Sequence, residues 1–254
     1  MFIHRLIAGN DTKLFFMSRP RRFGKSLTVS ALKAIFQGRR ELFKGLYIDS
    51  TDWKWEKYPV IHFEFNDVTT TSLEEFEKDL ADHVENRLRE AGYAYDNTRS
   101  AHYNFGMAIT ELAAKCRENG NEKGGVVILI DEYDAPVGHA LDDIDFAEKV
   151  RERLSAVYSQ MKNRTGDIKF LFMTGVSKFT RLSVFSALSN LVDVSQDTEY
   201  ATMFGYTEEE LSILLKHLPP HSTSAHKKTH QAYEAYEAYQ AYEAYQNLPI
   251  IGEN

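Results

Sequence analysis

The sequence predicts an α/β protein, a three-layer sandwich in which helices cover both faces of a central, mainly parallel sheet. Short apolar runs alternate along the chain with stretches of helical periodicity, and this alternation implies right-handed strand–helix–strand crossovers. Two of the runs, at 126–130 and 169–174, are almost continuously apolar. Such runs are typical of central parallel strands that are covered on both faces. We expect the domain to span residues 1–218.

The strands are expected at 14–18, 59–65, 126–130 and 169–174. In the second strand Ile61 and Phe63 alternate with His62 and Glu64, which predicts one more exposed face. Apolar residues at helical spacing predict helices at 26–37, 72–90, 105–119, 143–163 and 207–217. Ser72 begins the second helix as a candidate capping box.

Residues 219–254 differ in kind from the rest. Pro219 and Pro220 end the last predicted helix, and a polar stretch leads into an array with tyrosine at every third position over 232–246. In an α-helix this spacing turns about 300° per repeat, so the tyrosines spiral and leave no single apolar face. We therefore expect a low-complexity, disordered tail. The alternative is a tyrosine-rich interaction segment.

Composition excludes several classes of protein. The single cysteine, Cys116, cannot form an intramolecular disulfide, so we expect a reducing, cytoplasmic compartment. No apolar run approaches the roughly 18 residues of a membrane span. The net charge of −7 argues against general adhesion to nucleic acid or anionic lipid. Residues 12–40 nevertheless hold eight basic side chains and no acidic one, which indicates an anionic ligand.

The strongest motif is SRPRRFGKSL at 18–27, directly after the first strand. It resembles the phosphate-binding pattern G-x-x-x-x-G-K-[ST], with Arg19 in place of the first glycine. Gly24 lets backbone amides approach a phosphate, Lys25 suits the β- and γ-phosphate oxygens, and the Ser26 hydroxyl suits Mg²⁺. The predicted ligand is ATP with Mg²⁺. The flanking residues complete the expected binding set: Arg21, Arg22, Phe23 and Leu27. Arg21 and Arg22 could equally dock to acids such as Asp134.

A second motif, VVILIDEYDAP at 126–136, places two acids directly after a buried strand. Acids at the carboxyl end of a parallel strand face the crevice where such sheets bind ligands. We expect Asp131 to hold the magnesium and Glu132 to polarise the attacking water. The alternative is an ordinary solvated turn.

The run at 169–181 supplies the remaining candidates. Thr174, at the tip of the fourth strand, suits a sensor of the γ-phosphate or of the attacking water, with Ser177 as second choice; the alternative is a hydroxyl satisfied by a turn. Lys178 and Arg181 follow, and either could neutralise developing charge in cis or reach the nucleotide of a neighbouring subunit, with Arg181 as the candidate catalytic residue; the alternative is a pair of solvated basic side chains.

These motifs together resemble the prokaryotic AAA-ATPase-like family, and the similar stretch covers residues 13–216. The resemblance is carried by the segments RPRRFGKSL, QGRRELFKGLYI, WEKYPVIHFEFNDV, VVILIDEYDAP, FLFMTGVSKFTRLSVFSALSNLVDVS and YATMFGYTEEEL. The resemblance implies a P-loop ATPase domain that binds and hydrolyses ATP, usually followed by a restriction-endonuclease-like nuclease domain. We expect that nuclease to be absent here, and we read Asp52-Trp53-Lys54 as a surface loop.

The expected partners are the nucleotide and either a second copy or an unknown protein. Two alternatives to an ATPase stay open at this stage: a nucleotide-gated binding module without useful turnover, and an inactive remnant of a longer ATPase–nuclease. Weaker features have plainer interpretations. Cys116 reads as a small core residue, and the aromatic group of Trp53, Trp55 and Tyr58 as packing at the start of the second strand. The histidines at 221, 226 and 230 lack a carboxylate or cysteine to complete a metal site.

Overall fold

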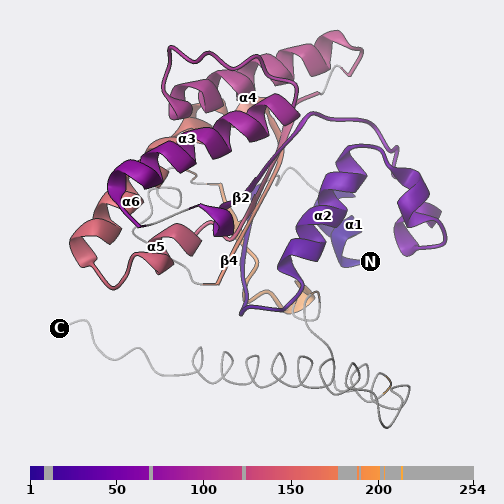
Figure 1. Ribbon diagram of the computed structural model, residues 1–254. Coiled ribbons are helices and arrows are strands. Elements are labelled where there is room, and N and C mark those ends of the chain that lie inside the picture. The colour runs from indigo at the N-terminus through magenta and orange to yellow at the C-terminus, as the bar shows by residue number, and fades with distance from the viewer. Residues whose placement is uncertain are drawn as a thin grey trace, which may run out of the picture.

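The computed structural model describes residues 1–8, 14–68, 71–121, 124–176, 188, 190–200, 203 and 213. These residues form a five-stranded sheet in the order β2-β3-β4-β1-β5, and every paired neighbour in it is parallel. Helices cover both faces (Figure 1): α1 and α2 lie on one side, and α3, α4, α5 and α6 on the other. The three-layer α/β fold predicted from the sequence is therefore confirmed.

The strands lie where the apolar runs predict them. Their bounds are Leu14–Ser18 for β1, Val60–Glu64 for β2, Val126–Asp131 for β3, Ile168–Gly175 for β4 and Val192–Asp193 for β5. The sequence pattern did not predict β5, because a two-residue strand is too short to show a period.

Four of the predicted helices are confirmed, with shifted ends. The α-helices are α1 (Phe2–Ala8), α2 (Lys25–Phe36), α3 (Leu73–Glu90), α4 (Ala101–Glu118), α5 (Ala135–His139) and α6 (Ile144–Tyr158). After α6 the chain continues as a 3₁₀ segment, Ser159–Asp167. The helix predicted at 207–217 and the tail at 219–254 lie outside the described part of the chain, apart from Ile213.

The start of α3 forms half of the predicted capping box. The hydroxyl of Ser72 accepts the backbone amide of Glu75 at 3.2 Å, as an N-cap should. The Glu75 carboxylate does not complete the reciprocal bond to the Ser72 amide; it accepts the hydroxyls of Thr71 and Ser72 instead. The α6 helix is capped in the same way by Asp143, which accepts the amide of Phe146 at 3.0 Å.

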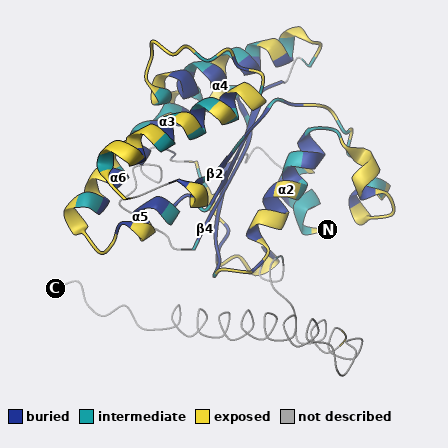
Figure 2. Cartoon of the chain, viewed as in Figure 1, coloured by how far each residue is buried: buried dark blue, intermediate teal, exposed yellow. Residues whose placement is uncertain are grey.

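Alternate side chains along the strands belong to two hydrophobic cores, one on each face of the sheet (Figure 2). In β1, Leu14 and Phe16 face the core under α3, α4 and α6, while Phe15 and Met17 face α2. Strand β2 follows the predicted alternation, since Ile61 is fully buried and His62 only half-buried. Burial of both faces explains why β3 and β4 read as continuous apolar runs.

The aromatic residues before β2 pack against other aromatic rings, which confirms the packing predicted at the start of this strand. Trp53 and Tyr58 each meet the ring of Phe36 edge-on at 5.9 Å between ring centroids. Trp55 lies against Phe43 at 5.4 Å. Cys116 is buried on α4, which confirms its reading as a core residue.

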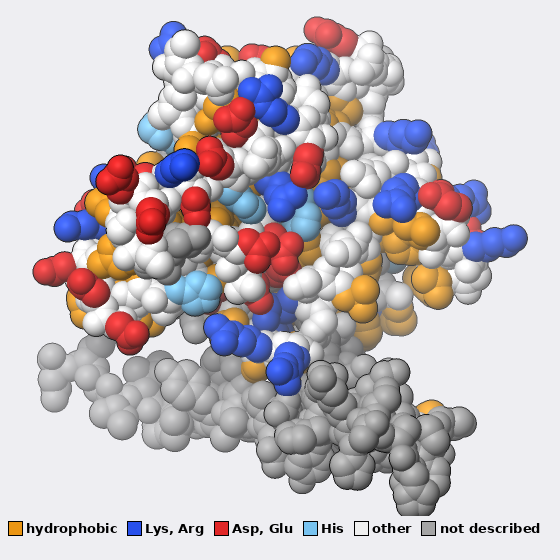
Figure 3. Space-filling view, viewed as in Figure 1, with side chains coloured by type: hydrophobic (Ala, Val, Ile, Leu, Met, Phe, Trp, Pro, Cys, Tyr) orange, Lys and Arg blue, Asp and Glu red, His pale blue; other side chains and the backbone are white. Residues whose placement is uncertain are grey.

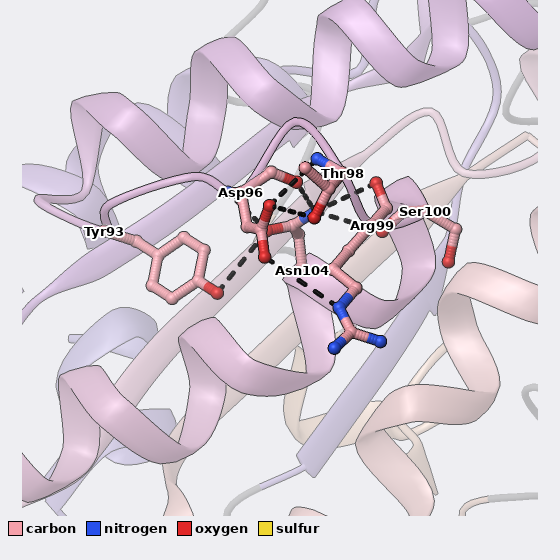
Figure 4. Close-up of polar contacts among 6 residues, drawn as sticks. All are labelled: Tyr93, Asp96, Thr98, Arg99, Ser100 and Asn104. Carbon is pink, nitrogen blue, oxygen red and sulfur yellow. Dashed lines mark hydrogen bonds and ion pairs between the residues drawn. The ribbon is translucent and has the colours of Figure 1, made fainter.

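The turn between α3 and α4 is organised by Asn104, a fully buried side chain on α4 (Figure 4). Its amide oxygen accepts the backbone amide of Asp96 at 2.9 Å, and its amide nitrogen donates to the carbonyls of Asp96, Arg99 and Ser100. The Tyr93 hydroxyl donates to the same amide oxygen at 3.4 Å. One side chain thus satisfies the polar backbone of an irregular turn.

Candidate functional site

The sequence candidates meet at the carboxyl edge of the sheet. Strand β4 lies between β1 and β3, so the loop that follows β1 and the acids that end β3 flank the tip of β4 from opposite sides. Lys25, Asp131 and Thr174 therefore come together although 149 positions separate the first from the last. Crevices at this edge are where open parallel sheets bind ligands.

The loop after β1 runs through residues 19–24 and passes directly into α2. Gly24, the N-cap residue, has φ +86°, and a Cβ added there would meet nothing within 4 Å. Glycine is therefore needed for its left-handed backbone and not for space. Arg22 shares this conformation with φ +68°. The amide end of a twelve-residue helix follows, which carries a partial positive charge.

Lys25 is buried inside the loop that it follows. Its ammonium donates to the backbone carbonyls of Arg19 and Pro20, each at 3.0 Å. Burial lowers its pKa, while the carboxylates of Glu132 and Asp131 act to raise it. The ammonium is thus held by the loop and faces the acids at the end of β3.

Thr174 joins the two acids to β4. Its hydroxyl donates to the Asp131 carboxylate and lies 3.4 Å from the backbone amide of Glu132, which donates to it. Asp131 is only 1% exposed, so it is not the residue of a solvated turn. The Thr174 hydroxyl is thus satisfied by the Asp131 carboxylate and the Glu132 amide, and its role as a sensor stays a prediction.

Glu132 occupies an unusual position for a carboxylate. Its backbone is left-handed, with φ +51°, and its side chain is half-buried. Burial raises the pKa of Glu132 and the neighbouring Asp131 raises it further, against the opposing effect of Lys25 and Arg21. Non-glycine residues in this conformation cost free energy and gather at functional sites.

The ends of β3 and β4 are fastened to each other beyond these acids. The Asp134 carboxylate accepts the Val176 amide, at 3.0 Å and 3.2 Å to its two oxygens. The Tyr133 amide donates to the Thr174 carbonyl at 3.0 Å. A Cβ at Gly175 would lie 2.5 Å from the Tyr133 ring, so this close approach requires glycine. Asp134 therefore holds the tip of β4.

The other sequence candidates divide into three groups. The exposed ones lie around the loop: Arg21, Arg22, Ser26 and Leu27, the last 75% exposed. Phe23 is buried in the core beneath α2. Ser177, Lys178 and Arg181 lie outside the described residues. Figure 3 shows acidic side chains gathered at the centre of one face, with Lys and Arg side chains beside and below them.

Sequence reasoning missed the contacts on the far side of the loop. Arg19, which stands where the motif has glycine, is 3% exposed, and its guanidinium donates to the carbonyls of Ser18 and Ser195. The Ser18 amide donates to the Ser195 hydroxyl at 2.9 Å. No pattern in the sequence could have paired residues 177 positions apart without knowledge of β5.

Three further features of the described residues concern the molecule away from this edge. A cavity of about 850 Å³ lies at the amino ends of β2 and β4, lined by residues that include Tyr58, Lys115, Cys116 and Lys169, and it is not part of the site. Among the described residues no group of three or more His, Cys, Asp or Glu side chains could hold a metal ion. None of the helices described there is long and apolar enough to cross a membrane.

Comparison with known proteins identifies the family of the chain. Residues 1–185 match the family described as Predicted AAA-ATPase, so the chain belongs to this AAA-ATPase-like family. It is 35% identical over 201 residues to an uncharacterized protein in the vnfD 5′ region of Azotobacter chroococcum mcd 1. That match covers 79% of this chain and 37% of the relative, so the chain spans about a third of the relative's length.

One solved structure is also similar, the ORC2 protein of Aeropyrum pernix in its ADPNP–ADP complexes. The TM-score is 0.39 and the sequence identity 14%, with 85% of this chain and 48% of that chain covered.

Proposed function

We propose that residues 1–218 form a domain that binds ATP with Mg²⁺ at the carboxyl edge of its sheet and hydrolyses it. One observation carries the proposal. The buried Lys25 ammonium lies close enough to Glu132 for each charge to shift the pKa of the other group, and the Thr174 hydroxyl joins the Asp131 carboxylate to the backbone amide of Glu132. Family membership supports nucleotide binding independently.

The side chains present suit a magnesium nucleotide. Magnesium prefers oxygen ligands, and the Ser26 hydroxyl and the Asp131 carboxylate are of that kind. Only one oxygen of Asp131 is engaged by the Thr174 hydroxyl in the described contacts. A bound magnesium ion would neutralise charge on the phosphate oxygens. The left-handed loop at Gly24 would bring backbone amides to the same phosphates, with Arg21 and Arg22 at its rim.

The chain's own groups account for the proton and the charge in hydrolysis. Water attacks the γ-phosphorus, the bond to the β-phosphate oxygen breaks, and ADP and inorganic phosphate leave. Glu132 accepts the proton that the water loses, and its raised pKa brings it nearer to the working range of a general base. Lys25 would neutralise charge on the β- and γ-phosphate oxygens. Thr174 would hold Asp131 and orient the water, and Arg181 is the proposed further cation.

The test is to separate binding from turnover with Glu132→Gln. The amide keeps the size of the side chain but cannot accept the proton, so ATP should stay bound while steady-state hydrolysis falls at least a hundredfold. Glu74→Gln, an exposed acid on α3, is the matched control and should hydrolyse at the parent rate. Equal rates for Glu132→Gln and the parent would remove Glu132 from the mechanism. No hydrolysis by the parent would refute the enzymatic part of the proposal.

A further inference from the structure

Arg19 is the junction of three parts of the candidate site. Its backbone amide donates to the Gly175 carbonyl at the tip of β4, at 3.1 Å. Its backbone carbonyl accepts the Lys25 ammonium at 3.0 Å. Its guanidinium donates to the Ser195 carbonyl in the segment that follows β5, and to the Ser18 carbonyl at 3.0 Å. A single residue thus touches the strand of Thr174, the loop lysine and the chain beyond β5.

The junction is built from buried groups. Ser18, Arg19, Lys25 and Ser195 are all between 3% and 6% exposed. The Ser195 hydroxyl accepts the Ser18 amide at 2.9 Å, and the Ser18 hydroxyl lies 3.2 Å away. Ser195 is itself fixed, because its amide donates to the Asp193 carboxylate on β5 at 2.9 Å. A buried guanidinium is costly unless it is hydrogen-bonded, so its place here calls for a role.

We propose that Arg19 is a positioning residue for Lys25: by anchoring the start of the loop to Ser195, it sets where the Lys25 ammonium stands for the phosphates. The described contacts of its guanidinium run to the backbone carbonyls of Ser18, at the end of β1, and Ser195, beyond β5, so the side chain serves as a brace between these two segments. The inference rests on the proposed function, since it assigns Arg19 a part in the same site.

The role follows from the geometry of the loop. Without the guanidinium bonds, the backbone of Arg19 would lose its described tie to Ser195 and would keep the bond from its amide to the Gly175 carbonyl. The Lys25 ammonium would then lose one fixed anchor, leaving the Pro20 carbonyl as the other. Small displacements of a charged group from its productive position weaken binding strongly. The effect of losing Arg19 should therefore pass through Lys25.

A double-mutant cycle on ATP affinity tests this route. Calorimetric titration with Mg-ATP is applied to the parent, Arg19→Gln, Lys25→Ala and the double variant. Arg19→Gln should weaken binding about tenfold in the parent background and less than twofold in the Lys25→Ala background, because the anchored group is already gone. Full additivity of the two changes would overturn the proposal and make Arg19 a phosphate ligand.

Two further variants serve as a conservative substitution and as a matched control. Arg19→Lys keeps the charge but replaces the guanidinium, whose Nη1 donates to both carbonyls, with a shorter side chain, so its ATP affinity should fall between the parent and Arg19→Gln. It also serves if Arg19→Gln does not fold. Arg89→Gln, a half-exposed arginine on α3, is the matched control and should bind ATP as the parent does.

The outcomes separate this inference from the proposed function. A parent chain that binds no Mg-ATP refutes both. A parent that binds Mg-ATP, with Lys25→Ala weakened and both Arg19 variants at parental affinity, refutes the positioning role alone. A lowered melting temperature with unchanged affinity has the same meaning, since Arg19 would then serve only the fold.

Discussion

At the scale of single residues, the site depends on charges that are buried and held by neutral groups. Lys25 is fixed by two carbonyls and Asp131 by one hydroxyl, so neither the cation nor the anion needs the other as a direct ion-pair partner. Such an arrangement keeps both charges available for a third, ionic group. It also makes each neutral partner a point where a small substitution should have a large effect.

Thr174→Val tests the neutral partner of Asp131. Valine has nearly the same shape but no hydroxyl, so the buried Asp131 carboxylate loses its donor and the chain should lose about 1–3 kcal/mol of unfolding free energy. We also expect ATP hydrolysis to fall at least tenfold, because the variant no longer holds Asp131 or orients the attacking water. Urea unfolding and a steady-state assay measure the two effects. Thr174→Ser, which keeps the hydroxyl, should retain most of both, and a Thr174→Val variant indistinguishable from the parent would contradict the role.

At the scale of elements, one buried side chain on a helix organises the turn that precedes it. The α3–α4 turn depends on Asn104, whose amide makes hydrogen bonds with the backbone of three turn residues (Figure 4). Asn104→Ala should lower the unfolding free energy by about 2–4 kcal/mol, because several buried backbone groups lose their partner. Urea denaturation checks it against Asn97→Ala, an exposed asparagine of the same turn. Equal stabilities would show that water replaces the side chain.

Two half-buried histidines, His62 on β2 and His83 on α3, should make the stability of the fold depend on pH. Burial first, then the cations Lys33 and Arg87, lower the pKa of His62 to about 4, and burial with Arg87 lowers the pKa of His83 to about 4. In the unfolded chain both histidines are protonated below about pH 6.5, whereas in the folded chain they stay neutral down to about pH 4. Their contribution to the free energy of unfolding should be fully present above pH 6.5 and should be lost as the pH falls from 6.5 towards 4.

Unfolding free energies at pH 7 and pH 5 measure this effect. Each histidine should contribute about 1 kcal/mol to the loss, discounted for the exposed part of each ring. His62→Gln and His83→Gln should each reduce the loss between the two pH values, whereas His102→Gln, on the exposed face of α4, should leave it unchanged. The same loss in all four proteins would place the acid sensitivity elsewhere.

How far the sequence predicts the elements depends on how local the signal is. A hydrophobic pattern within a short window of sequence predicts the strands β1 to β4 and the helices α2, α3, α4 and α6. Strand β5 and the short helix α5 do not, because two and five residues are too few for a period. The 3₁₀ ending after α6 was read as a continued helix, since its apolar spacing persists for a further turn before Arg164 leaves the helical region.

The same contrast applies to the candidate site. Gly24, Lys25 and Ser26 stand next to one another in a pattern with known chemistry, and Asp131 and Glu132 end a strand whose burial is visible in its composition. The bond from Thr174 to Asp131 requires β4 to lie beside β3, a pairing between residues more than 40 positions apart. The brace from Arg19 to Ser195 requires β5 beside β1, and no local pattern carries that information.

At the scale of the whole molecule, the strand order explains why these distant segments meet. Placing β4 between β1 and β3 brings a basic loop, a hydroxyl and two acids to one edge of the sheet. The chain as a whole carries a net charge of −7, and its basic side chains at 12–40 include those of this loop. An acidic protein that gathers cations at one edge favours an anionic ligand there over general adhesion to polyanions.

The central claim is that this edge binds Mg-ATP through Lys25. Calorimetric titration of the parent chain with Mg-ATP should show one saturable site, and Lys25→Ala should weaken it roughly ten- to hundredfold, since a charge-assisted hydrogen bond contributes about 1.5–3 kcal/mol. Lys78→Ala, an exposed lysine on α3, should bind as the parent does. Equal affinities of the parent and Lys25→Ala, or no binding by the parent, would contradict the account.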